Sequence, residues 1–187
     1  MSRFNQGGLL IDPKFIVLHY TASRTAKSAI AWFRNRESKV SAHFVIDRDG
    51  TVIPCVPTNR IAWTNGVSEW RGFTDLNKHA ISVELVNQGP VRPVGNTHQY
   101  EDFYGNPVPA SDVYKGEFGP YGYWHKYTEA QVTACNALID KLASEHPTLE
   151  ELVGHSDISP TRKHDPGPSL EIARPRRMRS RTESEST

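Results

Sequence analysis

Residues 15–20 read Phe-Ile-Val-Leu-His-Tyr, and this short run decides which fold the chain can adopt. An apolar run of this length predicts a strand over residues 14–20, and His19 ends the run, where a strand delivers a side chain to the rim of a sheet. Asp49-Gly50 is typical of a tight turn between two neighbouring strands. The further strands that we predict lie near residues 41–48, 51–55 and 80–86.

Two helices are predicted between and after these strands, near residues 25–36 and 128–146. The second helix begins at Thr128 with Gln131 three positions later, which is a capping-box pattern. Its apolar stripe packs into a core and consists of Val132, Cys135, Leu138, Ile139 and Leu142. Strands that alternate with helices predict a single α/β domain, with a mixed central β-sheet flanked by helices and a functional site at strand ends and loops.

The loop Gly-His-Ser-Asp-Ile-Ser-Pro-Thr-Arg-Lys-His-Asp-Pro-Gly, residues 154–167, concentrates metal ligands and cations. Imidazoles and a carboxylate are the usual ligands of a catalytic zinc, and three protein ligands leave a fourth position open. His155 and Asp165 fit that role, and His19 would complete it from a distant segment. Histidine and aspartate are also common in surface loops that bind no metal. The spacing alone therefore leaves two alternatives, a metal site and an ordinary surface loop.

Five segments together resemble a known family, in the family's own order. They are VLHYTA at 17–22, VSAHFVIDRDGTV at 40–52, AWTNGVSEWRG at 62–72, HAISVELVN at 79–87 and GHSDISPTRKHDPGP at 154–168. They resemble the zinc-dependent N-acetylmuramoyl-L-alanine amidases, which include phage lysozyme-type amidases, bacterial anhydromuropeptide amidases and animal peptidoglycan recognition proteins. The phage branch typically has cysteine as its last ligand, so Asp165 places the resemblance closest to the bacterial branch.

The resemblance implies a zinc ion held by His19, His155 and Asp165, in a catalytic domain over residues 11–172. It implies Glu84 as the catalytic glutamate, which suits a general base that takes a proton from zinc-activated water. Lys163 matches a family lysine and would stabilise the oxyanion. The implied activity is hydrolysis of the amide between N-acetylmuramic acid and L-alanine in peptidoglycan or its fragments.

Each of these residues also has an ordinary structural reading. His19 could be a hydrogen-bonded core histidine, Glu84 a solvated residue on an exposed strand face, and Lys163 part of a solvent-exposed basic loop.

Two alternative functions also remain for the chain. One is a module that binds muropeptides without cutting them, and the other is a zinc amidase for another acyl amide. Loss of a metal ligand would mark the first rival, and all three ligands are present.

Substrate contacts are expected from a polar and aromatic group of residues, namely His43, Trp63, Asn65, Trp70, Arg71 and Asn77. His43 could line the cleft or be structural, and the sequence slightly favours the structural role. Ala42 stands where lysozyme-type relatives often carry tyrosine, and Thr64 stands where relatives commonly carry histidine after the tryptophan. Trp63 could equally pack against the sheet.

The segments outside the motifs carry weaker signals. Residues 88–127 are rich in Gly, Pro, Tyr and Trp, and they predict a long irregular insertion that could wall the cleft. Residues 1–10 form an N-terminal extension, and the Arg- and Ser-rich residues 173–187 are typical of a disordered tail. Cys55 and Cys135 are expected to be buried free thiols, although a bridge between them stays possible.

The bulk composition is that of one enzyme domain. The 187 residues carry a net charge of +1, which indicates no strong field for nucleic acid, and no apolar run is long enough to span a bilayer. Residues 1–8 lack the apolar core of a secretory signal. We therefore expect a location in the bacterial cytoplasm or release by another route, as for a phage lysis enzyme or exported effector. The oligomeric state is open.

Overall fold

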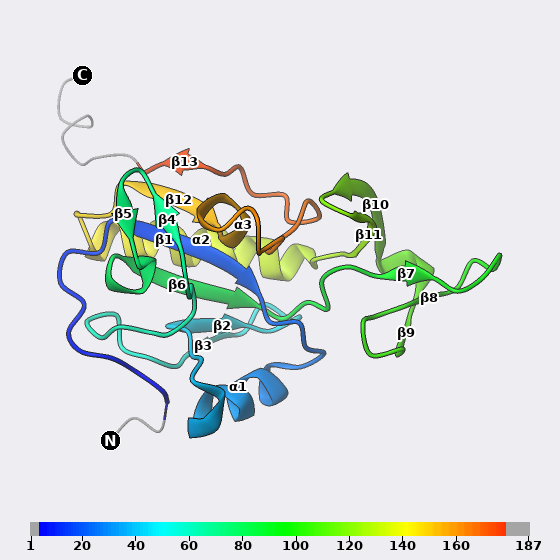
Figure 1. Cartoon of the computed structure of the whole chain (residues 1–187), viewed down its shortest axis with the longest axis horizontal. Helices are drawn as coiled ribbons and strands as arrows, with labels where there is room; N and C mark the ends of the chain where they lie inside the picture. The colour runs from blue at the N-terminus through cyan, green and yellow to red at the C-terminus, as the bar shows by residue number, and fades with distance from the viewer. Residues whose placement is uncertain (1–3, 179–187) are drawn as a thin grey trace.

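A six-stranded mixed sheet forms the centre of the molecule (Figure 1). The computed structural model describes residues 4–178 of the chain. The strand order is β13-β12-β1-β6-β2-β3. Strands β12, β1, β6 and β2 run parallel, whereas β3 and β13 pair antiparallel at the two edges. The parallel strands therefore present their carboxyl ends at one edge of the sheet.

The helices and strands have the following bounds. The central sheet contains β1 (Phe15–Tyr20), β2 (Phe44–Ile46), β3 (Val52–Pro54), β6 (Ala80–Leu85), β12 (Glu151–Gly154) and β13 (Arg176–Arg177). The α-helices are α1 (Ala26–Arg34), α2 (Glu129–Glu145) and α3 (His155–Ile158), and short 3-10 turns cover Arg36–Ser38, Leu76–Lys78 and Ala110–Asp112. The remaining strands are β4 (Glu69–Trp70), β5 (Phe73–Thr74), β7 (Arg92–Pro93), β8 (Tyr100–Glu101), β9 (Pro107–Val108), β10 (Val113–Phe118) and β11 (Tyr121–His125).

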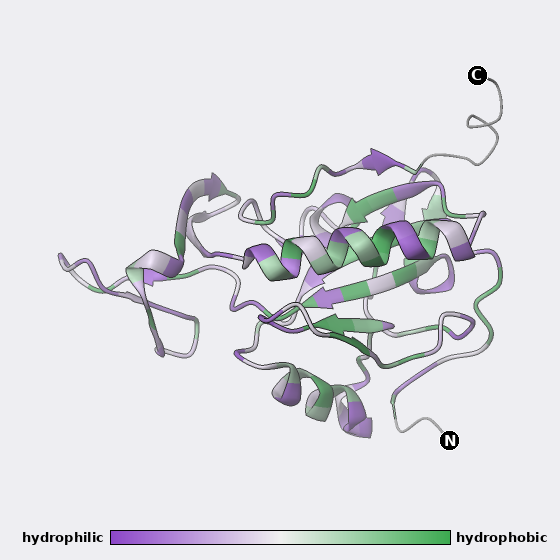
Figure 2. Cartoon of the chain, turned by 180° about the vertical axis from the view of Figure 1, so that it is seen from behind, coloured by the Kyte–Doolittle hydropathy of each residue, from purple (hydrophilic) through white to green (hydrophobic). Residues whose placement is uncertain are grey.

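Helix α2 covers one face of the sheet, as Figure 2 shows from behind. Its apolar stripe packs on alternate residues of the parallel strands, among them Leu18, Val83 and Leu152. The residues between them point to the opposite face, where Phe15, Val17, Val153 and Ile158 form a second cluster. Helix α1 and the β4–β5 hairpin lie on that opposite face (Figure 1). His19 and Glu84 belong to the opposite face, since they alternate with Leu18 and Leu85.

The predicted α/β class is confirmed, and the elements with strong local patterns lie where they were expected. Thr128 and Gln131 form the predicted capping box, in which the Thr128 side chain accepts from the Gln131 backbone N–H. Cys55 and Cys135 are buried free thiols, also as predicted. Strand β12, helix α3 and the β4–β5 hairpin were not predicted.

The expectation of an irregular segment over residues 88–127 is wrong. This segment, which we call the arm, folds into two small antiparallel sheets that project from the end of the central sheet (Figure 1). Its two ends meet at a narrow neck. There the Asn87 side chain donates to the His125 carbonyl at 3.0 Å, and the His125 backbone N–H donates to the Gly89 carbonyl at 2.9 Å. Gly89 adopts a φ of 77°, and a Cβ there would lie 2.7 Å from the Tyr20 ring. The neck thus requires glycine.

The prediction of a disordered tail from residue 173 is wrong for its first part. Arg176 and Arg177 pair with β12 and extend the central sheet, because strand β12 would otherwise be an unpaired edge. Arg174 donates to the carbonyls of Leu170 and Ile172, each at 3.1 Å. Residues 179–187 of the predicted tail lie outside the described residues. In residues 4–178, the helices are all too short or too polar to cross a bilayer.

Candidate active site

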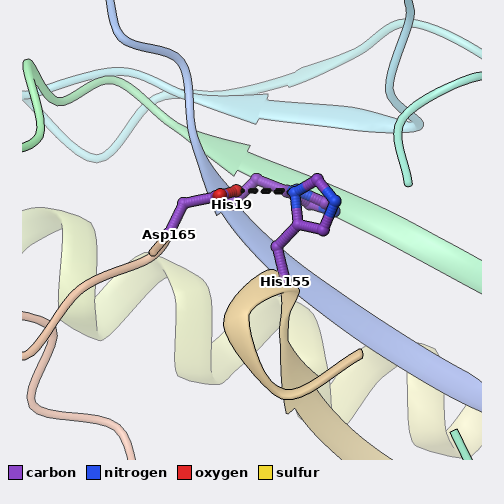
Figure 3. A group of neighbouring side chains, drawn as sticks. All are labelled: His19, His155 and Asp165. Carbon is purple, nitrogen blue, oxygen red and sulfur yellow. Dashed lines mark hydrogen bonds and ion pairs between the residues drawn. The ribbon is translucent and has the colours of Figure 1, made fainter. Parts of the chain in front are cut away.

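Three buried side chains converge at the carboxyl ends of β1 and β12 (Figure 3). His19 comes from β1, His155 from the first residue of α3, and Asp165 from the loop that follows. The two histidine Nδ1 atoms lie 2.9 Å apart, and Asp165 Oδ2 lies 3.0 Å from His19 Nδ1 and 2.9 Å from His155 Nδ1. Three ligand atoms therefore form one compact triangle, which confirms that these distant segments meet.

The local sequence explains why the three residues meet. Strand β1 pairs in parallel with β12, and Leu18 is aligned with Gly154, so His155 leaves the sheet next to His19. Gly154 is needed here because a Cβ at this position would lie 2.8 Å from Pro166 Cδ. Pro166 therefore packs directly on the end of β12. The backbone bond from Ser156 N–H to the Asp165 carbonyl, at 2.8 Å, then holds the aspartate over the triangle.

A chain of hydrogen bonds fixes the orientation of His155. Its Nε2 lies 2.9 Å from the carbonyl oxygen of Asn65, which can only accept, so Nε2 carries the proton and Nδ1 keeps its lone pair. The Asn65 backbone is held in turn by Asn77, whose Oδ1 accepts from the N–H groups of Thr64 and Asn65 at 3.0 and 2.8 Å. Arg162 donates to the same Asn65 carbonyl at 2.8 Å.

The electrostatics of the triangle favour a neutral His19 and an ionised Asp165. Burial, together with the neighbouring His155, lowers the pKa of His19 to about 4. Burial alone would raise the pKa of Asp165, but the close contacts with the His155 and His19 side chains outweigh burial and hold that pKa well below its usual value. Neutral imidazole and carboxylate are the protonation states that bind a metal.

Glu84 lies beside this triangle on the neighbouring strand. It is aligned with His19 in the β1–β6 register and is 8% exposed. Its Oε2 has no hydrogen-bond partner among the described residues. Burial and, secondarily, the charge of Asp165 raise the pKa of Glu84 to about 8. Glu84 is therefore buried, and it is not the solvated residue on an exposed strand face that the sequence also allowed.

The triangle and Glu84 form the floor of a cleft of about 440 Å³. Lys163 and Arg162 line the same cleft, so two positive charges face the site. The walls also include three residues that the sequence did not identify, namely Tyr20, Trp32 and Ser41. Tyr121 lines the cleft as well, and it belongs to the segment 88–127 that the sequence suggested as a wall of the cleft. Tyr20 follows His19 directly, and Arg162 stands within the metal loop, so proximity to the motifs was the available signal for both.

Two of the expected substrate-contact residues are buried inside the domain. His43 has no exposed surface, and both of its ring nitrogens bind backbone groups: Nδ1 accepts from Ser82 N–H and Nε2 donates to the Arg60 carbonyl. We therefore correct the substrate assignment of His43 to a structural role. Asn65 is also fully buried, and it faces the site through its backbone carbonyl.

The other expected contacts lie away from the cleft. Trp70 and Arg71 both donate to Glu151, at 2.9 and 2.8 Å, at the opposite end of the sheet from His155. The β4–β5 hairpin carries them there, so the structure does not bring them to the triangle. Trp63 is 37% exposed and lies beside Gly7 instead of lining the cleft. Asn77 acts on the site only through the backbone of Thr64 and Asn65.

The residues present fit a metal ion. A tetrahedral zinc with ligand distances near 2.0–2.1 Å requires ligand atoms about 3.3 Å apart, and the edges here are 2.9–3.0 Å. Two histidine nitrogens with one carboxylate oxygen are a common donor set for catalytic zinc. The tautomer of His155 also leaves its Nδ1 available, as a ligand role demands.

Comparison with known proteins agrees with this geometry. The family described as N-acetylmuramoyl-L-alanine amidase matches residues 10–168. The N-acetylmuramoyl-L-alanine amidase AmiD of Escherichia coli is 30% identical over 163 residues, which are 83% of this chain and 49% of AmiD. The 1,6-anhydro-N-acetylmuramyl-L-alanine amidase AmpD of Citrobacter freundii is 29% identical over 137 residues, 73% of this chain and 55% of AmpD. The chain thus spans about half the length of these relatives.

Solved structures show the same arrangement of elements. The complex of E. coli AmiD with anhydro-N-acetylmuramic acid-L-Ala-D-γ-Glu-L-Lys superposes with a TM-score of 0.62 at 26% identity, covering 86% of this chain and 55% of that one. AmpDh3 of Pseudomonas aeruginosa in complex with anhydromuramic pentapeptide gives 0.63 at 27% identity, covering 86% and 57%. Because the family match spans most of the chain and includes all three residues of the triangle, the chain belongs to the N-acetylmuramoyl-L-alanine amidase family, as its motifs predicted.

Proposed function

We propose that this domain hydrolyses the amide bond between N-acetylmuramic acid and L-alanine in peptidoglycan or its fragments. The observation that carries the proposal is the convergence of His19, His155 and Asp165 beside the buried Glu84, on the floor of an open cleft. The AmiD structure supports the choice of substrate, since its bound molecule contains anhydro-N-acetylmuramic acid joined to L-alanine.

We propose zinc as the metal of this site, with His19, His155 and Asp165 as its ligands. The nitrogen and oxygen donor set and the enforced tautomer of His155 support that choice. When bound, zinc would supply a Lewis acid and a positive charge that lowers the pKa of nearby acids, water included.

Glu84 is the general base in this proposal. Its carboxylate is buried, and Oε2 has no competing partner among the described residues, so it can accept the proton of the attacking water. The same carboxyl group then delivers that proton to the leaving nitrogen of L-alanine, which completes the transfer. Because His19 and Glu84 are aligned on adjacent strands, the base is held rigidly beside the ligands.

Lys163 stabilises the negative charge that develops on the amide oxygen. It lines the cleft two residues before Asp165, and its loop is held by the bond from Lys163 N–H to the Ser159 carbonyl at 2.9 Å. An ammonium group that the protein positions beside the developing charge stabilises that charge more than water would.

The test is mass-spectrometric detection of free stem peptide from a defined muropeptide. It compares wild type, chelator-treated protein with and without added zinc, and Glu84→Gln, which keeps the size of the side chain. We expect release that requires both zinc and Glu84. Binding without release by the zinc-loaded wild type would establish the recognition-module alternative, and release from simple acyl amides alone would establish the broader amidase.

A further inference from the structure

A second cavity, of about 350 Å³, lies between the arm and the cleft. We call it the arm pocket; its lining is Tyr20, Ala22, Gln88, Pro90, Val91, Arg92, Asp102, Phe103, Tyr104 and Tyr121. Three of these residues, Tyr20, Ala22 and Tyr121, also line the cleft that holds the triangle. The arm pocket is therefore a direct continuation of the candidate active site.

Two strongly exposed aromatic rings stand at the rim of the arm pocket. Phe103 is 84% and Tyr104 73% exposed, and the two rings pack edge to face with centroids 5.4 Å apart. Large apolar side chains in such positions mark interaction sites when they line a groove. They lie on the β8–β9 turn, which projects with the arm from the body of the domain (Figure 1).

This turn is rigidly attached to the active site. Asp102 is 2% exposed, and its Oδ1 accepts from the backbone N–H groups of Tyr104 and Asn106, each at 2.9 Å. Its Oδ2 accepts from the side chain of Gln88, which follows the Glu84 strand by three residues. The backbone that carries the two aromatic rings is thus tied to the strand of Glu84, which lowers the entropy cost of ordering this turn when a ligand binds.

Charge distinguishes the arm pocket from the cleft. Arg162 and Lys163 bring two positive charges to the cleft. In the arm pocket, by contrast, Arg92 is paired with Glu101 at 2.6 Å, and Asp102 adds a carboxylate. A stem peptide carries the free carboxylate of its D-glutamate, which favours the part of the cleft that Arg162 and Lys163 line. A sugar ring is uncharged, offers a C–H face to aromatic rings and hydroxyls to groups such as Gln88.

We propose that the arm pocket binds a neutral hexosamine ring of the glycan, while the stem peptide leaves the scissile amide along the Arg162 and Lys163 side. This inference rests on the proposed function, because it assumes that the substrate joins a glycan to a peptide at the triangle. Phe103 and Tyr104 are then specificity-determining residues that select substrates by the length of their glycan.

The first experiment measures binding of triacetylchitotriose to the metal-free protein by calorimetry, so its readout does not depend on catalysis. The variants are Phe103→Ala/Tyr104→Ala, the conservative Tyr104→Phe, and Val94→Ala as a control on the arm outside the pocket. We expect about tenfold weaker binding for the double variant, since each lost aromatic contact costs about threefold. Tyr104→Phe and Val94→Ala should stay within twofold.

The second experiment compares KM for muropeptides with and without an attached N-acetylglucosamine. The double variant should raise KM about tenfold for the longer substrate only, with kcat unchanged. Chitotriose binding that the double variant leaves unchanged, or a glycan-free stem peptide that competes with chitotriose, would overturn the proposal. If chitotriose binds as expected and no muropeptide is cleaved, the amidase assignment fails and the sugar pocket stands. If muropeptides are cleaved and chitotriose does not bind, the amidase assignment stands and the sugar pocket fails.

Discussion

Asn77→Ala should weaken zinc binding although Asn77 does not reach the triangle. Its Oδ1 holds the backbone N–H groups of Thr64 and Asn65 at 3.0 and 2.8 Å, and the Asn65 carbonyl then fixes His155 Nε2 at 2.9 Å. Removing the Asn77 amide breaks both of these backbone hydrogen bonds, so the Asn65 carbonyl is held less firmly. Loss of an outer partner of this kind typically costs 10- to 100-fold in metal affinity, and we expect about tenfold because Arg162 still holds the carbonyl.

The stability change can be estimated from the same contacts. Two lost hydrogen bonds of about 1 kcal/mol each lower the free energy of unfolding by about 2 kcal/mol. For a domain of this size, that loss corresponds to a decrease in Tm of about 4–8 °C. Zinc affinity would be measured by competition with a chromogenic chelator, and Tm by calorimetry on the metal-free protein.

Two matched variants separate positioning from general destabilisation. Asn77→Asp keeps the acceptor oxygen and should restore most of the zinc affinity. Leu138→Ala removes a core side chain of α2 on the other face of the sheet, and should cost at least about 2 kcal/mol while leaving zinc affinity unchanged. If Asn77→Ala loses stability yet binds zinc within twofold of wild type, the hydrogen-bond chain does not position His155.

Three further predictions concern the base, the buried histidine and the hairpin. Glu84→Gln should reduce stem-peptide release by about 10²–10⁴-fold with zinc content unchanged, and activity within tenfold of wild type would exclude Glu84 as the base. Burial lowers the pKa of His43 from 6.5 to about 4, so between these pH values the unfolded chain binds more protons than the folded one. The contribution of neutral His43 to the free energy of unfolding should therefore be fully present above about pH 6.5. It should fall by about 3 kcal/mol as the pH drops to 4. Urea unfolding at several pH values should show a smaller fall for His43→Gln, and an identical fall would assign the effect to other groups. Arg71→Ala should leave KM for muropeptides within twofold of wild type, and a large increase in KM would restore the substrate role that its position argues against.

The elements that the sequence predicted are those with strong local signals. The apolar run at Phe15–Leu18 and the stripe of α2 identify themselves from their own residues. Strand β12 has only four residues, and it becomes a strand because it pairs with β1. The two-residue strands of the arm likewise depend on their partners. Such pairings are not visible in a local pattern.

In the candidate site, too, some residues could be predicted from local motifs and others could not. The three residues of the triangle, His19, His155 and Asp165, lie within motifs, so the sequence identified them together. Trp70 was expected to contact substrate because it belongs to a polar and aromatic group of residues, yet the β4–β5 hairpin turns it toward Glu151. The contribution of Asn65 comes through a backbone carbonyl, which residue type does not reveal.

The neck of the arm has a consequence for how this fold can be altered. Asn87, Gly89 and His125 join the two ends of the arm, so the hydrogen bonds that close the neck involve none of the residues farther out along the arm. Since each doubling of loop length costs only about 0.6 kcal/mol in closure entropy, arms of other lengths could be grafted at this point. The exposed turn at residues 95–98 would also accept new chain termini in a circular permutant. Substrate choice and bond cleavage could then be engineered as separate modules on one scaffold.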